Sequence, residues 1–186
     1  MLPRLLKGPF TVDDYHRLAE VGILHEDDRV ELIEGQVVVM SPIGARHAGC
    51  VDRLNRLLSR LVVQRAVVRV QNPVVLGDNA EPEPDLALLR TPITRYTNAH
   101  PRPADVLLVI EVADTSLAYD REVKLPLYAA NGIPEAWLVD LTGDRIEVHR
   151  GPGPDGYREV RLATRGETIT PINLPGIDIN VDDVLG

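Results

Sequence analysis

Residues 106–113 read VLLVIEVA, and this stretch decides the fold. It is apolar on both faces, as expected for a central strand that is covered on both sides. Glu111 is its only charged residue. Burying an ionised carboxylate without a partner costs several kcal/mol, so Glu111 must be paired, protonated or bound to a metal ion. The alternative, that the strand ends there and Glu111 reaches solvent, ranks second because Val112 and Ala113 continue the apolar run.

A second apolar strand, DLALLR, opens on Asp85 directly after the acidic, proline-rich EPEP. Proline before a strand holds the chain extended. Two carboxylates from adjacent strand ends form, with waters and a phosphate, the oxygen-rich cage that Mg²⁺ prefers, whereas without a metal the two anions would repel each other. We therefore expect Asp85 and Glu111 to bind Mg²⁺ or Mn²⁺. The neighbouring Glu81 and Glu83 are expected to be solvated loop charges.

The segment 114–140 predicts a helix that ends near residues 131–132, followed by a strand. In such a helix Asp120, Lys124 and Tyr128 fall at successive i, i+4 positions and share one face. Pro126 permits this only if it lies in the first helical turn or at a kink.

Lys124 has two interpretations. One is a surface ion pair with Asp120, worth a few tenths of a kcal/mol. The other turns Lys124 toward Glu111, where its ammonium orients a water molecule or screens developing charge. Only two lysines occur in the chain, Lys7 and Lys124, and every other basic residue is arginine apart from the histidines, which makes Lys124 an unusual choice.

The patterns along the chain predict an α/β (α+β) fold, a mixed central sheet flanked by helices. Helices are expected at 11–22, 45–64 and up to 132; a β-hairpin at 29–40 around Glu34-Gly35; and strands or extended segments at 67–76, 85–90, 106–113, 136–140, 144–150 and 157–163. The tail from residue 170 is loop-rich with at most one short strand. Without a repeat or a clear linker, residues 1–186 are expected to form a single domain.

Several motifs come in the order and spacing of a known family. They are PD at 84–85, EV at 111–112 with downstream Ser, Asp, Lys and Tyr, GIPEAWLVD at 132–140, and VELIEGQVVVMSP at 30–42 followed by His47. Over roughly residues 10–145 the chain resembles a bacterial restriction endonuclease family of the PD-(D/E)XK nuclease superfamily. This resemblance implies a restriction-endonuclease-like fold and a Mg²⁺-dependent endonuclease acting on DNA. Asp85, Glu111 and Lys124 would then be catalytic.

The usual superfamily pattern has a lysine two residues after the glutamate, where this chain has Ala113. The resemblance implies that Lys124 replaces that lysine from the neighbouring helix. It also implies that Glu31 joins the site, although a solvent-facing strand charge is nearly as well supported. Supporting roles are expected for Glu31, His47, Gln71, Asp120 and Tyr128, with Asp120 or Tyr128 orienting Lys124.

The helix from Ala45 has an apolar arc, and His47 lies in the middle of it and so points inward. A buried histidine is more often a hydrogen-bonded core residue than a ligand, so a place in the site and a core role are weighted equally. Beside the arc runs a stripe of arginines expected to bind nucleic acid, against the alternative of a solvated helix face. The stripe consists of Arg46, Arg53, Arg56 and Arg60.

The net charge of −8 argues against a simple duplex-binding protein, whose footprint is normally basic. Residues 46–69 nevertheless hold six arginines against Asp52, so a local basic strip can bind DNA despite the global sign. Cutting two strands needs two sites, which a homodimer supplies. The absence of a long apolar run or a signal peptide predicts a cytoplasmic location and no membrane association.

Two other functions compete with the nuclease hypothesis. One is a non-catalytic nuclease-fold module that binds nucleic acid or protein and need not bind a metal at Asp85 and Glu111. The other is a small-molecule phosphohydrolase that uses the same carboxylates; no glycine-rich phosphate loop supports it.

Overall fold

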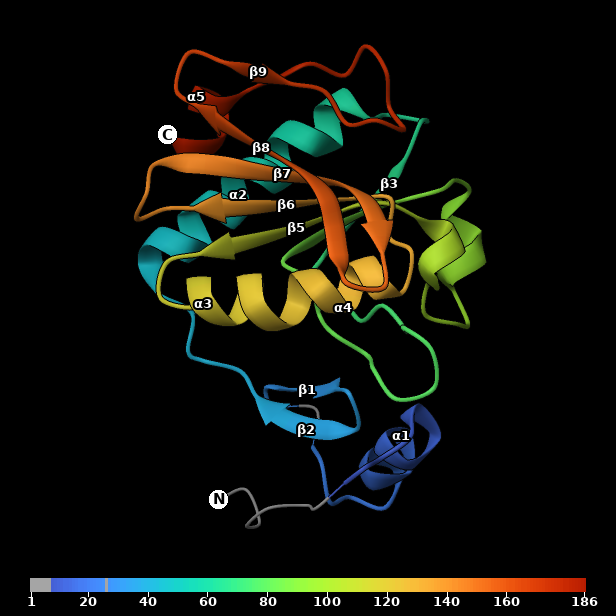
Figure 1. Ribbon diagram of the computed structural model, residues 1–186. Helices are drawn as coiled ribbons and strands as arrows, with labels where there is room; N and C mark the ends of the chain where they lie inside the picture. Colours follow the sequence, from blue (N-terminus) through green and yellow to red (C-terminus); the bar gives the residue numbers. More distant parts are fainter. Residues whose placement is uncertain (1–7, 26) are drawn as a thin grey trace.

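A six-stranded sheet with strand order β3-β4-β5-β6-β7-β8 forms the centre of the computed structural model, which describes residues 8–25 and 27–186 (Figure 1). Its strands are β3 Val67–Val70, β4 Leu86–Leu89, β5 Val106–Ala113, β6 Glu135–Asp140, β7 Arg145–Gly153 and β8 Gly156–Thr164. Only the β5–β6 pair is parallel. The predicted mixed sheet is confirmed.

Helices cover both faces of this sheet. Behind it in Figure 1 lies α2 (Ala45–Leu61), and in front lies a continuous helix made of α3 (Leu117–Tyr119), a π-helical turn η3 (Asp120–Lys124) and α4 (Leu125–Ala130). This second helix is the crossover between the parallel strands β5 and β6. Within the described residues, no helix is both long and apolar enough to cross a membrane.

Strand β5 is buried along its whole length, as its sequence predicts. Leu108 and Ile110 pack with the buried residues of α2, whereas Val109 and Ala113 pack with those of α4. Because side chains alternate along a strand, Glu111 points to the α4 side. The isolated charge of β5 is thus directed at the crossover helix.

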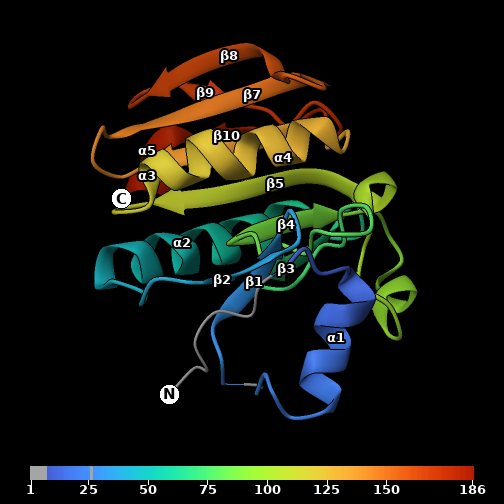
Figure 2. The ribbon, with the colours of Figure 1, turned by 60° about the horizontal axis from the view of Figure 1, so that its bottom comes forward.

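The N-terminal elements form a separate layer, seen below the sheet in Figure 1; in Figure 2 their hairpin crosses in front of β3 and β4. They are α1 (Val12–Glu20), which has a capping box at Thr11 and Asp14, and a hairpin of β1 (Val30–Ile33) and β2 (Gln36–Val39). The hairpin turns at residues 34–35, both with positive φ. It is attached to the segment before β4 by reciprocal backbone hydrogen bonds of 2.7 and 3.4 Å between Leu32 and Glu81.

Two expected elements differ in the structure. The extended segment 67–76 is a strand only to Val70, because Gln71 has a φ of 48° and Pro73 can donate no hydrogen bond to a ladder. The tail has the one short strand that was expected, β10 (Ile179–Asn180), which pairs with β9 (Thr168–Ile169) just before the tail. It ends in a helix that was not expected, α5 (Val181–Leu185).

Candidate active site

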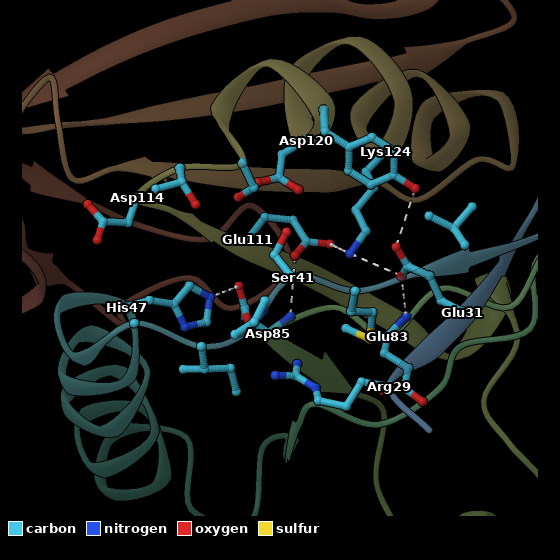
Figure 3. Close-up of a pocket in the computed structure, with 18 of the residues that line it drawn as sticks. Arg29, Glu31, Ser41, His47, Glu83, Asp85, Glu111, Asp114, Asp120 and Lys124 are labelled. Carbon is cyan, nitrogen blue, oxygen red and sulfur yellow. Dashed lines mark hydrogen bonds and ion pairs between the residues drawn. The ribbon is translucent and has the colours of Figure 1, made fainter. Parts of the chain in front are cut away.

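A pocket of about 470 Å³ opens where the two sheet-covering helices approach the hairpin (Figure 3). Because β4 and β5 are antiparallel, the start of β4 and the end of β5 lie side by side at this pocket. The start of α2, the α3–η3 segment, the hairpin and the segment 38–44 complete the lining. Most of the predicted catalytic and supporting residues line this pocket, namely Glu31, His47, Asp85, Glu111, Asp120 and Lys124; Gln71 and Tyr128 are not part of its lining.

Asp85 lies immediately before β4 and is held by three hydrogen-bonding groups. His47 Nε2 lies 2.9 Å from Oδ2, the backbone N–H of Val112 donates to Oδ2 over 2.9 Å, and the Gln71 amide donates to Oδ1 over 3.2 Å. These contacts fix the carboxylate beside the residue that follows Glu111. The predicted supporting residues His47 and Gln71 therefore contact Asp85 directly.

Glu111 is only 2% exposed, so its charge is not solvated. Its Oε1 accepts a hydrogen bond from the Tyr128 hydroxyl and lies 3.2 Å from Lys124 Nζ, while Oε2 faces the backbone N–H of Asp85 at 3.4 Å. Burial raises the pKa of Glu111 to about 8, against the opposing effect of Lys124. A further cation beside Glu111 would therefore stabilise its ionised form.

Lys124 bridges two buried carboxylates. Its Nζ lies 3.2 Å from Glu111 Oε1 and 3.2 Å from Glu31 Oε2. Burial disfavours the ammonium, but Glu111 and Glu31 outweigh it and raise the pKa of Lys124, so the side chain is charged. Lys124 is thus no surface ion-pair residue: it is directed at the strand glutamate, as the sharper interpretation of the sequence requires.

The π-helical turn explains how Pro126 fits. In this turn the N–H of Leu125 donates to the carbonyl of Asp120, five residues earlier. Pro126, second in α4, has no N–H, so a regular α-helix would leave a carbonyl without its donor there. The wider turn takes up this break and leaves Asp120, Lys124 and Tyr128 all buried. Such turns are frequent at functional sites.

The two residues expected to orient Lys124 form their side-chain hydrogen bonds with other residues. The hydroxyl of Tyr128 donates to Glu111, and the carboxylate of Asp120 accepts from Ser116. Burial raises the pKa of Asp120. Lys124 is positioned by its carboxylate partners instead.

Glu31 on strand β1 of the hairpin and Glu83 on the loop before β4 line one side of the pocket. Glu31 is 2% exposed and accepts from the backbone N–H of Glu83 and from the Tyr119 hydroxyl. The prediction that Glu81 and Glu83 are solvated is wrong. Glu81 is buried, and Glu83 is half-buried in the pocket wall, where burial and then Glu31 raise its pKa. The hairpin covers their loop, a long-range contact that no local pattern reports.

His47 faces the pocket from the first turn of α2. Its contact with Asp85 raises its pKa, which favours the imidazolium. Its Nδ1 is buried and has no hydrogen-bond partner among the described residues. The sequence pattern therefore placed His47 inward correctly, and it lies in the pocket wall.

The arginine stripe is only partly available to a ligand. Arg53 donates to the carbonyls of Val184 and Leu185 and so caps the C-terminal helix; this removes it from the expected nucleic-acid-binding set. Arg46 pairs with Asp114 at 2.8 Å on the rim of the pocket. Arg56 and Arg60 are exposed.

The pocket carries a surplus of negative charge. It is lined by six carboxylates, namely Glu31, Glu83, Asp85, Glu111, Asp114 and Asp120, against Arg29, Lys124 and His47. Carboxylate oxygens are the ligands that hard divalent cations prefer. The residues present thus fit a divalent metal, and Asp85 and Glu111 could supply protein ligands to it.

A mixed sheet with an aspartate at the start of one strand, a glutamate inside the next and a lysine 3.2 Å from that glutamate is the arrangement expected of the PD-(D/E)XK class of nuclease folds. Residues 12–182 match the model of the Uma2 family, described as "Putative restriction endonuclease", and the chain belongs to this family.

A solved structure among those that match has the same fold. It is a crystal structure from Anabaena variabilis ATCC 29413 of "a putative nuclease belonging to DUF820", with a TM-score of 0.75 and 17% sequence identity. The alignment covers 95% of this chain and 98% of the other. No curated protein matches the chain.

Proposed function

We propose that this protein is an endonuclease that hydrolyses DNA phosphodiester bonds with Mg²⁺ or Mn²⁺. Membership of a nuclease family supports the reaction class. The observation that carries the proposal is the convergence of Asp85, Glu111 and Lys124 on one pocket, with Lys124 Nζ 3.2 Å from Glu111.

Asp85 and Glu111 would hold the cation. Bound there, it would lower the pKa of a water molecule and neutralise charge on the reacting phosphate. His47, Gln71 and the N–H of Val112 fix Asp85, and Tyr128 fixes Glu111, so both carboxylates are preorganised by their neighbours. Because the carboxylates are already in place, no free energy is needed to reorganise them during the reaction.

Lys124 is the group that would orient the attacking water. Its ammonium has three N–H donors, and Glu31 and Glu111 take two directions, which leaves one for a water in the pocket. Protonated His47, next to Asp85, would place a positive charge beside the reacting phosphate. These roles require no residue from outside the pocket.

Plasmid cleavage tests the proposal. We expect supercoiled DNA to be nicked or linearised when Mg²⁺ or Mn²⁺ is present and to stay intact when EDTA is in excess. Gel electrophoresis over a time course measures both products. DNA binding without cleavage in either metal would contradict the proposal and favour a non-catalytic binding module.

The proposal includes a homodimer, because a two-fold pair of sites would cut both strands of a duplex. Light scattering of the purified chain and the ratio of linear to nicked product test it. If the protein is a monomer and only nicks DNA, the homodimer proposal is contradicted, whereas the proposal of a hydrolytic site is not.

DNA binding should depend on Arg56 and Arg60 but not on Arg53. An arginine that neutralises one phosphate adds about 0.9 to the steepness with which log K falls against log salt, so replacing both exposed arginines with alanine should lower that slope by about 1.8. Fluorescence anisotropy of a labelled duplex in EDTA measures the slope without cleavage.

Two single variants serve as controls for this measurement. Arg158→Ala changes an exposed arginine on β8, at the far edge of the sheet, and should leave the slope unchanged. Arg53→Ala should lower the melting temperature, since the carbonyls of α5 lose their donor, and also leave the slope unchanged. If Arg158→Ala lowered the slope as much as the loss of Arg56 or Arg60 does, DNA binding would depend on net charge and not on the arginines of α2.

A further inference from the structure

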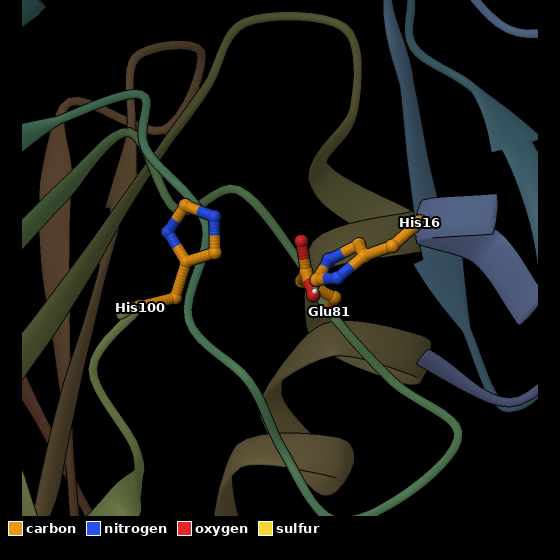
Figure 4. Close-up of side chains that lie close together, drawn as sticks. All are labelled: His16, Glu81 and His100. Atoms are coloured by element: carbon orange, nitrogen blue, oxygen red, sulfur yellow. Dashed lines mark hydrogen bonds and ion pairs between the residues drawn. The ribbon is translucent and has the colours of Figure 1, made fainter. Parts of the chain in front are cut away.

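A second group of ligand side chains lies outside the pocket. His16 on α1, Glu81 between β3 and β4, and His100 between η1 (Ile93–Tyr96) and η2 (Pro103–Asp105) converge from three separate segments (Figure 4). One ligand atom of each lies within 4.8 Å of the other two. Within the described residues, this is the one group of three or more His, Cys, Asp or Glu side chains that meets this spacing.

The carboxylate at its centre has one side-chain partner among the described residues. Glu81 is 3% exposed, and the hydrogen bond of its side chain is to His16, with Nε2 2.8 Å from Oε2. The imidazole of His16 is 44% exposed, so it gives the carboxylate only one partly solvated contact. A buried carboxylate that is ionised requires a stronger counter-charge. A metal ion at this position would supply one.

The third side chain is available for the same ion. The ring of His100 takes part in no hydrogen bond among the described residues, and it lies edge-on to His16 with the ring centroids 6.2 Å apart. A neutral imidazole offers one nitrogen lone pair to a metal ion.

The backbone around these residues is already fixed. Val74 donates to the carbonyl of Pro82, next to Glu81, and Val75 donates to the carbonyl of Pro101, next to His100. Both hydrogen bonds are 3.0 Å long and both start from one dipeptide. The two loops that carry Glu81 and His100 therefore have a set spacing.

Two imidazoles and one carboxylate form a donor set unlike that of the pocket. Nitrogen donors suit zinc and other late transition metals, whereas Mg²⁺ prefers oxygen alone. With three protein ligands, a fourth position stays open for water. We propose that His16, Glu81 and His100 bind one transition-metal ion, with Zn²⁺ as the best-matched ion, at a site separate from the nuclease pocket.

Binding there would fasten the N-terminal layer to the sheet domain. Helix α1 has no buried residue, so apolar packing holds it weakly. Glu81 pairs through its backbone with Leu32, next to Glu31, which contacts Lys124. A metal at Glu81 would thus hold both α1 and the strand that carries Glu31. This proposal is independent of the proposed nuclease activity.

Zinc titration of the full chain, freed of metal by a chelator, tests the site. We expect one Zn²⁺ per chain by calorimetry and a rise in melting temperature on its addition. His16→Ala and His100→Ala should each weaken binding by at least about a hundredfold, since even the loss of groups that only support metal ligands costs about 10–100-fold. Co²⁺ in place of Zn²⁺ should give visible absorption bands that both variants lose.

The matched control is His25→Ala, which removes an exposed histidine of the segment after α1. It should bind Zn²⁺ as the unchanged chain does. Because His100 lies on an exposed loop, His100→Ala should melt at the temperature of the metal-free chain, which separates lost binding from lost folding. Zinc binding that survives in the His16→Ala/His100→Ala double variant, or that Glu111→Gln removes, would overturn the proposal.

Discussion

Replacing Glu111 with glutamine should reduce plasmid cleavage about a thousandfold or more. Glutamine keeps the size of the side chain and an oxygen that can accept from Tyr128, but it removes the charge that would bind the cation. The loss of roughly 4 kcal/mol of transition-state stabilisation corresponds to about a thousandfold in rate. Asp85→Asn should have an effect of the same order. Initial rates of plasmid nicking in Mg²⁺ measure both.

The matched control is Glu122→Gln, which removes one negative charge from an exposed position of the same crossover helix. It should cleave at the rate of the unchanged protein. Circular dichroism should show that the Glu111 and Asp85 variants are folded. Undiminished cleavage by either of them would remove that residue from the catalytic site.

Lys124→Met should lower the free energy of unfolding by about 3–5 kcal/mol and also abolish cleavage. Methionine keeps most of the apolar stem but leaves Glu31 and Glu111, both 2% exposed, without their shared cation. Removal of one partner from a buried ion pair typically has this magnitude, because the remaining charge is left uncompensated. Urea unfolding in metal-free buffer measures the change.

A double-mutant cycle identifies the source of that loss. Glu31→Gln removes one of the two carboxylates that Lys124→Met leaves without a cation. It should therefore destabilise the unchanged protein but recover stability in the Lys124→Met background. Equal effects of Glu31→Gln in both backgrounds would show that the two side chains are not coupled. In that case the position of Lys124 would have another cause.

The strands and the central carboxylates were predictable because their signals are local. A single charge in VLLVIEVA identifies a buried acid, and Glu34-Gly35 between alternating apolar residues predicts a hairpin turn. The antiparallel pairing of β4 and β5 then brings Asp85 beside Glu111. Lys124 needed the resemblance in addition, since its spacing alone is equally compatible with a surface ion pair.

What the sequence did not predict depends on contacts between distant segments. Glu81 and Glu83 look solvated in EPEPD, yet the hairpin from far earlier in the chain covers them. Arg53 looks like a member of the stripe, yet the C-terminal helix takes its donors, and that helix was itself not predicted. Side-chain partners of this kind are determined by the tertiary fold, and no periodic pattern in the sequence indicates them.

The π-helical turn makes the length of one short segment critical. An α-helix rotates by about 100° per residue, so the extra residue of such a turn displaces all later side chains around the axis by that amount. At the start of the turn Asp120 lines the pocket, and after the turn Tyr128 donates to Glu111. One deletion or insertion between residues 120 and 124 would therefore exchange the side chains that meet the sheet, even with every other residue unchanged. Here the count of residues, as much as their identity, encodes the site.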